Sequence, residues 1–411
     1  MKICYISQVD ISLSNGPGVN EREFLLTLKE ETIRRGDSAF CLIPKPTFDQ
    51  GLTLPDTDFF DTTLSITRFA PLNRFLAGIK LAFSIIRITL RNDYDLFVLR
   101  LSRTGIFIPV LLSLLKKPYC IKTLGNVKKF NKTKHEKGPS FVERFLFLLF
   151  RKTLRNSLFI DVCTPQLEHL YRSEFDIENI EVIDNSVNTD RFYPLPRQEC
   201  KKTCGLGEFD RIVGYCGGKP SQRGAQQLIK ISHKLFERYP NAGIVIIGED
   251  EDLDTLRNKV SEYGLADRIR FTGIVDYTEL NPYLNCFDVG VALDTTRRIH
   301  LLGNSSQKIR QYIACGIPVI CAKDTNEELI RKKLGTWISI QDTDKLFHDV
   351  CYWLDLSEEQ RASFREKARE YAAEHLSCRV SYNKRYHAWE KALHKHYGSS
   401  TSVLKKPGNN T

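Results

Sequence analysis

The chain has 411 residues, of which 42% are hydrophobic and 27% are charged. That length exceeds what one hydrophobic core usually serves, so we expect two folded domains and no need for disulfide staples. The net charge of +10 indicates an anionic partner, such as a nucleotide, a bilayer surface or a nucleic acid. No run of about 18 uncharged apolar residues occurs, and hydropathy therefore predicts no transmembrane helix.

The twelve cysteines are scattered and form no CxxC pair. Cys200 and Cys204 are the one close pair, with no histidine or second pair nearby to complete a zinc set. Met1-Lys2 leads directly into an apolar strand pattern, which does not fit a signal peptide. We therefore expect reduced, mostly buried thiols in a cytoplasmic protein.

The first half of the chain alternates strand and helix patterns. Helices are expected at residues 19–35 and 106–115, the first closed by Gly36. Strands are expected at residues 3–7, 39–43, 96–99, 119–123, 159–163 and 180–183. Strands that alternate with helices predict a parallel sheet covered by helices on both faces.

The second half repeats this alternation. Helices are expected at residues 225–238, 253–262 and 358–396. Strands are expected at residues 211–216, 244–248, 269–272, 289–293 and 318–322. Two such α/β runs, joined near Pro194-Leu195-Pro196, predict two Rossmann-like domains with a cleft between them. We place them at residues 1–190 and 191–397, followed by a disordered tail at 398–411.

The segment from Ser305 to Ile320 is the most informative stretch of the chain. It predicts a polar loop, a short helix with apolar Ile309 and Ile313, a stop at Gly316, and a buried strand. A loop that enters a helix presents unpaired backbone N–H groups and the positive end of the helix dipole, which together attract an anion. Lys308 falls in the first turn, where a cation is unfavourable unless an anion binds there.

A glycine-rich loop, residues 217–224, follows an expected strand and precedes a helix. In this setting backbone amides can approach a pyrophosphate, although many such loops are only tight connections. Lys219 and Arg223 would supply positive charge to balance a departing diphosphate.

These motifs resemble those of GT-B glycosyltransferases of the retaining, family 4-like, group 1 type. The segment 305–320 is similar to the family's Ser-Pro-x-Lys-x-x-Glu-Tyr-x-Ala-x-Gly-x-Pro-Val-Ile. Residues 182–194 resemble its Val-Ile-Pro-Asn-Gly-Val-Asp-x-x-x-Phe-x-Pro, a loop expected to shape the hinge. The loop 217–224 resembles its Gly-Arg-x-x-x-x-Lys-Gly, with Gly218 in place of the arginine. The resemblance implies an α/β GT-B fold, with two Rossmann-like domains facing each other across a cleft.

The resemblance also implies an activity and a set of site residues. A sugar would pass from a nucleoside-diphosphate sugar to a hydroxyl acceptor with retention, and Arg223 and Lys308 would be catalytic. The donor diphosphate and ribose would contact Gly217, Gly218, Lys219, Arg223, Gly303, Asn304, Ser305, Ser306, Lys308 and Gln311. The nucleobase would meet Gly273, Ile274 and Val275, and the acceptor side would include Gly16, Pro17 and Gly18. Gly16–Gly18 can equally be a simple helix entry turn.

The resemblance further implies that no cofactor and no essential metal are needed, because cationic side chains and helix ends would neutralise the leaving group. The acidic run from Glu249 to Asp252 could suggest a metal site. Acidic residues at this position more simply favour the N-terminus of the helix expected at 253–262.

The chain also departs from the family pattern at Gly303, Gln311 and Leu124. The family has two glutamates eight residues apart, where this chain has Gly303 and Gln311, and Leu124 replaces a histidine. A glutamine can hydrogen-bond the ribose diol but carries no charge, so it would bind the ribose more weakly than a glutamate does. These departures leave room for a catalytically weakened GT-B protein that acts as a nucleotide-binding or scaffold subunit.

Two basic, amphipathic regions, residues 72–91 and 116–155, fit an acceptor at an anionic membrane surface. Helices packed on their own sheet with a solvated basic edge fit them equally well. We therefore expect a cytoplasmic protein, peripheral on the inner face of the plasma membrane, that acts on a lipid-linked or cell-surface glycan precursor.

Two other function classes have less support. A nucleotide-sugar epimerase would need paired carboxylates in the cleft, and the sequence identifies none. A nucleic-acid-binding protein is favoured by net charge alone, since no helix-turn-helix, RNP or zinc motif occurs. We accordingly expect no nucleic-acid partner.

Overall fold

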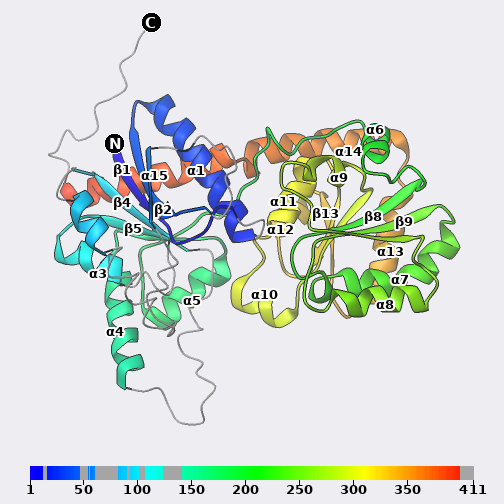
Figure 1. The fold of residues 1–411 in the computed structure, drawn as a ribbon, viewed down its shortest axis with the longest axis horizontal. Coiled ribbons are helices and arrows are strands. Elements are labelled where there is room, and N and C mark those ends of the chain that lie inside the picture. The colour runs from blue at the N-terminus through cyan, green and yellow to red at the C-terminus, as the bar shows by residue number, and fades with distance from the viewer. Residues whose placement is uncertain are drawn as a thin grey trace, which may run out of the picture. The chain divides into compact units, whose positions relative to one another are not determined.

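The structure is a computed structural model that describes residues 1–12, 16–46, 54, 56–60, 82–89, 93–100, 107–123 and 141–398. The chain divides into two compact units (Figure 1). Unit 1 contains the N-terminal part up to Asp184 together with the residues from Ser381 on, and unit 2 consists chiefly of Asn185–Val380. None of the helices described is long and apolar enough to cross a membrane.

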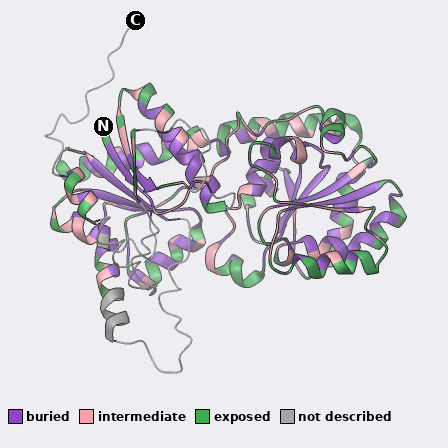
Figure 2. Cartoon of the chain, in the orientation of Figure 1, coloured by how far each residue is buried: buried purple, intermediate pink, exposed green. Residues whose placement is uncertain are grey.

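Unit 1 is built on a seven-stranded parallel sheet in the order β3-β2-β1-β4-β5-β6-β7. The strands are β1 (Lys2–Ile6), β2 (Ser38–Pro44), β3 (Asp56–Phe60), β4 (Leu96–Arg100), β5 (Tyr119–Thr123), β6 (Ile160–Val162) and β7 (Ile180–Val182). The helices are α1 (Gly16–Arg35), α3 (Phe107–Leu114), α4 (Phe141–Arg155), α5 (Pro165–Phe175) and α15 (Cys378–Tyr397), and residues 82–89 are also helical. The central strands are apolar and buried on both faces, as a covered parallel sheet requires (Figure 2).

Helices α1 and α15 cover one face of this sheet. Phe24, Leu25 and Leu28 of α1 share a core with Ile3 and Tyr5 of β1. Side chains of α15 complete the same core, namely Tyr382, Tyr386, Trp389 and Leu393. The last helix is therefore part of unit 1.

A row of charged side chains is buried under these two helices. Arg100, Lys122 and Asp161 are register partners on β4, β5 and β6, so all three project from the same face. Glu21 of α1 lies 3.3 Å from Arg100 and 3.7 Å from Lys122, and Arg385 of α15 pairs with Asp161. Burial lowers the pKa of Lys122 to about 7, although Glu21 opposes that shift. These ion pairs between helix and strand residues tie both helices to the sheet.

We predict that Asp161→Asn destabilises unit 1, because it leaves the Arg385 guanidinium buried without its counter-ion. The expected loss is about 3–5 kcal/mol of unfolding free energy, measured by urea titration, with faster hydrogen exchange in residues 381–397. Asp93→Asn is the matched control, since its pair with Lys117 is exposed and should contribute less than about 1 kcal/mol. Equal, small losses in both variants would refute this role for the buried pair.

Unit 2 contains a six-stranded parallel sheet in the order β10-β9-β8-β11-β12-β13. The strands are β8 (Arg211–Cys216), β9 (Ala242–Ile247), β10 (Ile269–Gly273), β11 (Val289–Ala292), β12 (Val319–Ala322) and β13 (Gly335–Ile338). The helices are α6 (Arg197–Thr203), α7 (Ala225–Arg238), α8 (Leu253–Glu262), α9 (Leu280–Asn285), α10 (Thr296–Leu302), α11 (Gln307–Ala314), α12 (Glu327–Arg331), α13 (Thr343–Leu354) and α14 (Glu358–Tyr371). A 3₁₀ turn (Pro220–Gln222) and a π-helical turn (Ala372–Leu376) complete the unit.

The two faces of this sheet are packed differently. Helices α7, α8 and α13 form one continuous apolar core with alternate residues of the strands. On the other face glycines replace side chains: a Cβ at Gly290 would lie 2.4 Å from the ring of Tyr312, and one at Gly214 2.0 Å from Phe287. This lets α11 lie close against the sheet.

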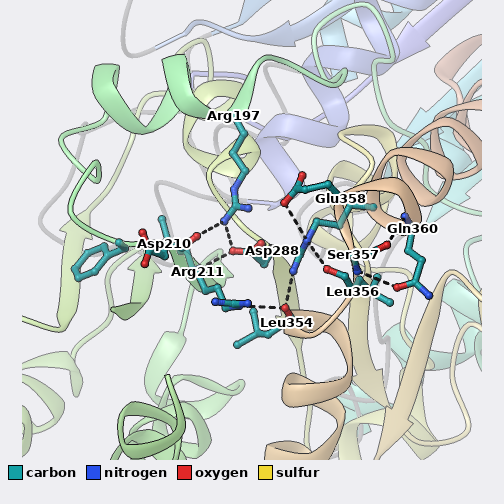
Figure 3. A network of polar contacts seen from close by, with 12 residues as sticks. Arg197, Asp210, Arg211, Asp288, Leu354, Leu356, Ser357, Glu358 and Gln360 are labelled. Atoms are coloured by element: carbon teal, nitrogen blue, oxygen red, sulfur yellow. Dashed lines mark hydrogen bonds and ion pairs between the residues drawn. The ribbon is translucent and has the colours of Figure 1, made fainter. Parts of the chain in front are cut away.

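A buried carboxylate, Asp288, fastens the elements around the start of β11 (Figure 3). It accepts hydrogen bonds from the backbone N–H of Ile212, from Arg361 of α14 and from Arg197 of α6. Two guanidiniums and one amide compensate the burial of the charge. This network links α6 and α14 to the middle of the sheet.

The sequence predicted the two Rossmann-like domains correctly, but several details differ. Strands β3 and β13 were missed, and the helix expected at 358–396 is broken by the π-helical turn. Residues 381–397 were assigned to the C-terminal domain, whereas they pack in unit 1 because Trp389 and its neighbours complete that core. Of the basic regions at 72–91 and 116–155, residues 72–81, 90–91 and 124–140, Leu124 included, lie outside the described residues, and so does the tail beyond Gly398.

Candidate functional site

Three glycines line the carboxyl edge of unit 2, at the ends of the neighbouring strands β8, β9 and β10. The Gly217 N–H donates to Ile247 O, and the Gly248 N–H donates to Gly273 O at 2.8 Å. Gly217 and Gly248 have φ of +130° and +122°, and a Cβ at Gly248 would lie 2.2 Å from Gly217 O. No other residue type fits these two positions. We call Gly217, Gly248 and Gly273 the glycine floor.

Lys308 places its amine at one end of the glycine floor. A Cβ at Gly217 would lie 3.1 Å from Lys308 Cε and 3.4 Å from Nζ, and Nζ lies 3.9 Å from the centre of the Tyr215 ring. Lys308 is only 7% exposed, and its Nζ makes no hydrogen bond to any residue that the structure describes. Burial, and next the charge of Arg223, lower the pKa of Lys308 to about 7.

Two arginines share a buried carboxylate beside Lys308. Asp294 follows β11, and its Oδ2 accepts from Arg298 Nε at 2.6 Å and lies 3.9 Å from Arg223 Nε. Asp294 also raises the pKa of Lys308, against the two arginines that lower it. The three cations and one carboxylate leave this end of the floor with a net positive charge.

The loop before α11 is held in place by Asn185. The Asn185 N–H donates to Ser305 Oγ at 3.1 Å, and its side-chain amide donates to Ser305 O at 2.7 Å. Arg310 donates to the carbonyls of Asn185 and Ser306. The segment 182–194 was expected to shape a hinge, and within unit 2 it also braces the loop that starts α11.

The structure brings Gly217, Arg223 and Lys308 together, as the sequence motifs predicted. Other expected donor residues lie along the same edge: Gly303 ends α10, and Asn304, Ser305 and Ser306 form the loop to α11. Gln311 is buried one turn after Lys308. Gly218 and Lys219 are exposed, with Lys219 in the left-handed conformation, and no described contact joins Lys219 to Lys308.

The residues expected to meet the nucleobase and the acceptor come from other segments of the chain. Gly273 belongs to the glycine floor, and Val275 is half-buried, while Ile274 is 71% exposed. Gly16, Pro17 and Gly18 are not a loop: they form the first turn of α1, which was the alternative interpretation. Their role on the acceptor side stays a prediction.

Sequence reasoning missed three charged residues of this edge, Asp294, Arg298 and Glu249. Asp294 carried a usable signal, because it directly follows a buried strand whose neighbours end in the glycine-rich loops. The acidic run 249–252 was expected to favour the N-terminus of α8, yet Asp250 Oδ2 accepts from the N–H and Oγ of Ser221. Among the described residues, no group of three or more His, Cys, Asp or Glu side chains could hold a metal ion.

We predict that Lys308→Met stabilises the ligand-free protein by about 1–3 kcal/mol at pH 6, since it removes a buried charge for which the described residues supply no hydrogen-bond partner. In the unfolded chain a lysine has a pKa near 10.4, against about 7 here. The unfolded state therefore binds more protons between about pH 7 and pH 10, and the wild type gains stability across that range as pH rises.

The measurement is the unfolding free energy of both proteins from pH 6 to pH 10, and the advantage of the variant should shrink toward pH 10. Lys122 titrates in the same range in both proteins and so drops out of the difference. A difference that does not change with pH would show that Lys308 keeps an ordinary pKa.

Residues 197–371 match the family described as glycosyl transferases group 1. One curated relative is a GDP-mannose-dependent alpha-(1-6)-phosphatidylinositol monomannoside mannosyltransferase of Mycolicibacterium smegmatis, 29% identical over 173 residues. That alignment covers 41% of this chain and 45% of the relative, so the chain spans less than half of the curated protein it matches.

Two solved structures share the fold across nearly the whole chain. Sucrose-phosphate synthase from Thermosynechococcus elongatus has a TM-score of 0.71 at 17% identity, covering 95% of this chain and 100% of that one. Anabaena HepE in complex with UDP has a TM-score of 0.68 at 13% identity, with 95% and 100% coverage.

The fold is therefore GT-B, with two Rossmann-like domains. Over residues 197–371 the chain is similar to the group 1 glycosyltransferases.

Proposed function

We propose that this protein is a retaining glycosyltransferase that moves a sugar from a nucleoside-diphosphate sugar to a hydroxyl acceptor. The observation that carries the proposal is the Lys308 amine, which is buried beside the Gly217 backbone and has no hydrogen-bond acceptor in the described part of the chain. A diphosphate at the glycine floor would supply the missing acceptor and favour the charged form of the amine. The group 1 family match over this unit, and the UDP bound to HepE, support the same reading.

The chemistry that this edge suits is departure of a diphosphate. As the bond between the sugar and the diphosphate breaks, negative charge grows on the leaving oxygen and positive charge on the sugar ring. Lys308, Arg223 and the backbone N–H groups at the start of α11 are placed to stabilise the leaving charge without reorganising. Under this proposal Arg223 and Lys308 are the catalytic residues, and no metal or cofactor takes part.

We propose that the acceptor is a lipid-linked or cell-surface glycan precursor at an anionic membrane face. In unit 1, α3 and α4 pack together, and Leu114 and Leu148 on them are exposed. Lys116 and Lys152 are exposed nearby in sequence. Apolar and basic side chains together suit the surface of an anionic bilayer. The match to an enzyme named for a phosphatidylinositol mannoside supports a lipid acceptor.

A second candidate function is a nucleotide-binding scaffold subunit with little turnover. Gly303 and Gln311 favour it, because the family's two carboxylates are absent from these positions. This alternative shares the nucleotide site and differs only in catalysis.

The expected result is that a nucleoside diphosphate raises the melting temperature of the wild type, since a ligand at 100 times its Kd adds about 2.7 kcal/mol of stability. Lys308→Met and Arg223→Ala should each weaken that binding by about tenfold or more, because each removes a charge-assisted contact to the diphosphate. Lys332→Met is the matched control: it removes one exposed cation from unit 2 and should leave binding unchanged.

A measurement of enzymatic turnover distinguishes the glycosyltransferase from the scaffold subunit. Release of nucleoside diphosphate from a panel of nucleotide sugars, with vesicles containing anionic lipid as acceptor, would support the transferase. Binding without release would favour the scaffold, and the absence of any nucleotide binding would contradict both.

A further inference from the structure

We propose that the donor nucleotide carries guanine, and that Glu249 selects it. This inference rests on the proposed function, since it names the base of the nucleotide that would bind at the glycine floor. It uses a residue to which the sequence motifs gave no role in the site.

The glycine floor has opposite charges at its two ends. Lys308 lies against Gly217 at the end of β8, with Arg223 and Arg298 nearby. Glu249 lies at the other end: a Cβ at Gly273 would be 3.5 Å from its Oε2. Since neighbouring strands are about 4.8 Å apart, the floor from β8 to β10 extends about 10 Å. An extended nucleoside diphosphate covers that length with its phosphates at the cationic end.

Glu249 is placed to contact a ligand. Its side chain is 37% exposed and its Oε2 accepts from Arg257 Nη2 at 3.1 Å. Arg257 also donates from Nη1 to Asp254 at 2.8 Å. It would therefore keep an ion-pair partner if the Glu249 side chain rotated toward a nucleobase. Ile274, exposed beside Gly273, offers an apolar surface for one face of the ring.

A carboxylate at the base end distinguishes among nucleobases. An ionised glutamate only accepts hydrogen bonds and can take two parallel donors. Guanine presents such a pair, N1–H and N2–H, on one edge. Uracil places its single N3–H between two carbonyl oxygens, and adenine and cytosine each set an amino group beside an acceptor nitrogen. In each of the other three bases, at least one acceptor atom would therefore face a carboxylate oxygen, which is repulsive.

The test is calorimetric binding of GDP, IDP, UDP, ADP and CDP to the wild type, Glu249→Gln and Glu251→Gln. IDP lacks only the 2-amino group of GDP. The control Glu251→Gln makes the same charge change at an exposed neighbour two residues away. The wild type should bind GDP about tenfold or more tighter than the other four nucleotides, as expected for charge-assisted hydrogen bonds.

Glu249→Gln should lose most of the GDP affinity and the difference between GDP and IDP, while Glu251→Gln keeps both. Melting temperatures of the variants confirm that each is folded. Preference for UDP, ADP or CDP in the wild type, or equal weakening of all five by Glu249→Gln, would overturn the guanine assignment alone. If none of the five binds, the proposed function itself fails.

Discussion

A parallel sheet brings the carboxyl ends of its strands to one edge, and in unit 2 that edge has no side chains at three successive strand ends. Gly248 has to be a glycine because its neighbour's carbonyl oxygen occupies the space of a Cβ. Gly217 leaves room for the Lys308 amine against the backbone. The lysine amine is thereby buried, and no oxygen of the residues that the structure describes accepts a hydrogen bond from it. The donor site that we propose follows from this close approach of backbone and buried cation.

Two of the buried lysines, Lys122 and Lys308, show how a cation that stabilises the fold differs from one that can bind a ligand. Burial lowers the pKa of both Lys122 and Lys308 to about 7. Lys122 has Glu21 at 3.7 Å and the ring of Phe24 at 3.8 Å from its Nζ, so its charge is compensated within unit 1. Lys308 has a ring but, among the described residues, no carboxylate within ion-pair distance, because Asp294 pairs with Arg298 and Arg223. A buried cation without a counter-ion at the carboxyl edge of the sheet indicates a binding site, whereas a buried ion pair such as Lys122 with Glu21 stabilises the fold.

The sequence predicted the fold where local signals were strong. Strands 119–123 and 211–216 and the helix 225–238 are correct to the residue, because a proline or glycine borders each of them, namely Pro118, Gly217 and Gly224. Strand β3 was missed because Asp56–Phe60 is an edge strand that lacks an apolar alternation. Arg223 and Lys308 could be proposed as site residues because each lies within a local motif. Asp294, Arg298 and Glu249 come from separate segments that only the tertiary fold brings to one edge, so no local pattern identified them.

The central claim is that the Lys308 amine is partly neutral in the ligand-free protein and becomes fully charged when an anion binds. The most direct measurement is the number of protons taken up when a nucleoside diphosphate binds at pH 8, obtained by calorimetry in buffers of different ionisation enthalpy. With a pKa of about 7, most Lys308 amines are neutral at pH 8, and binding should take up close to one proton more in the wild type than in Lys308→Met. Equal proton uptake by the two proteins, at measurable affinity in both, would contradict the account.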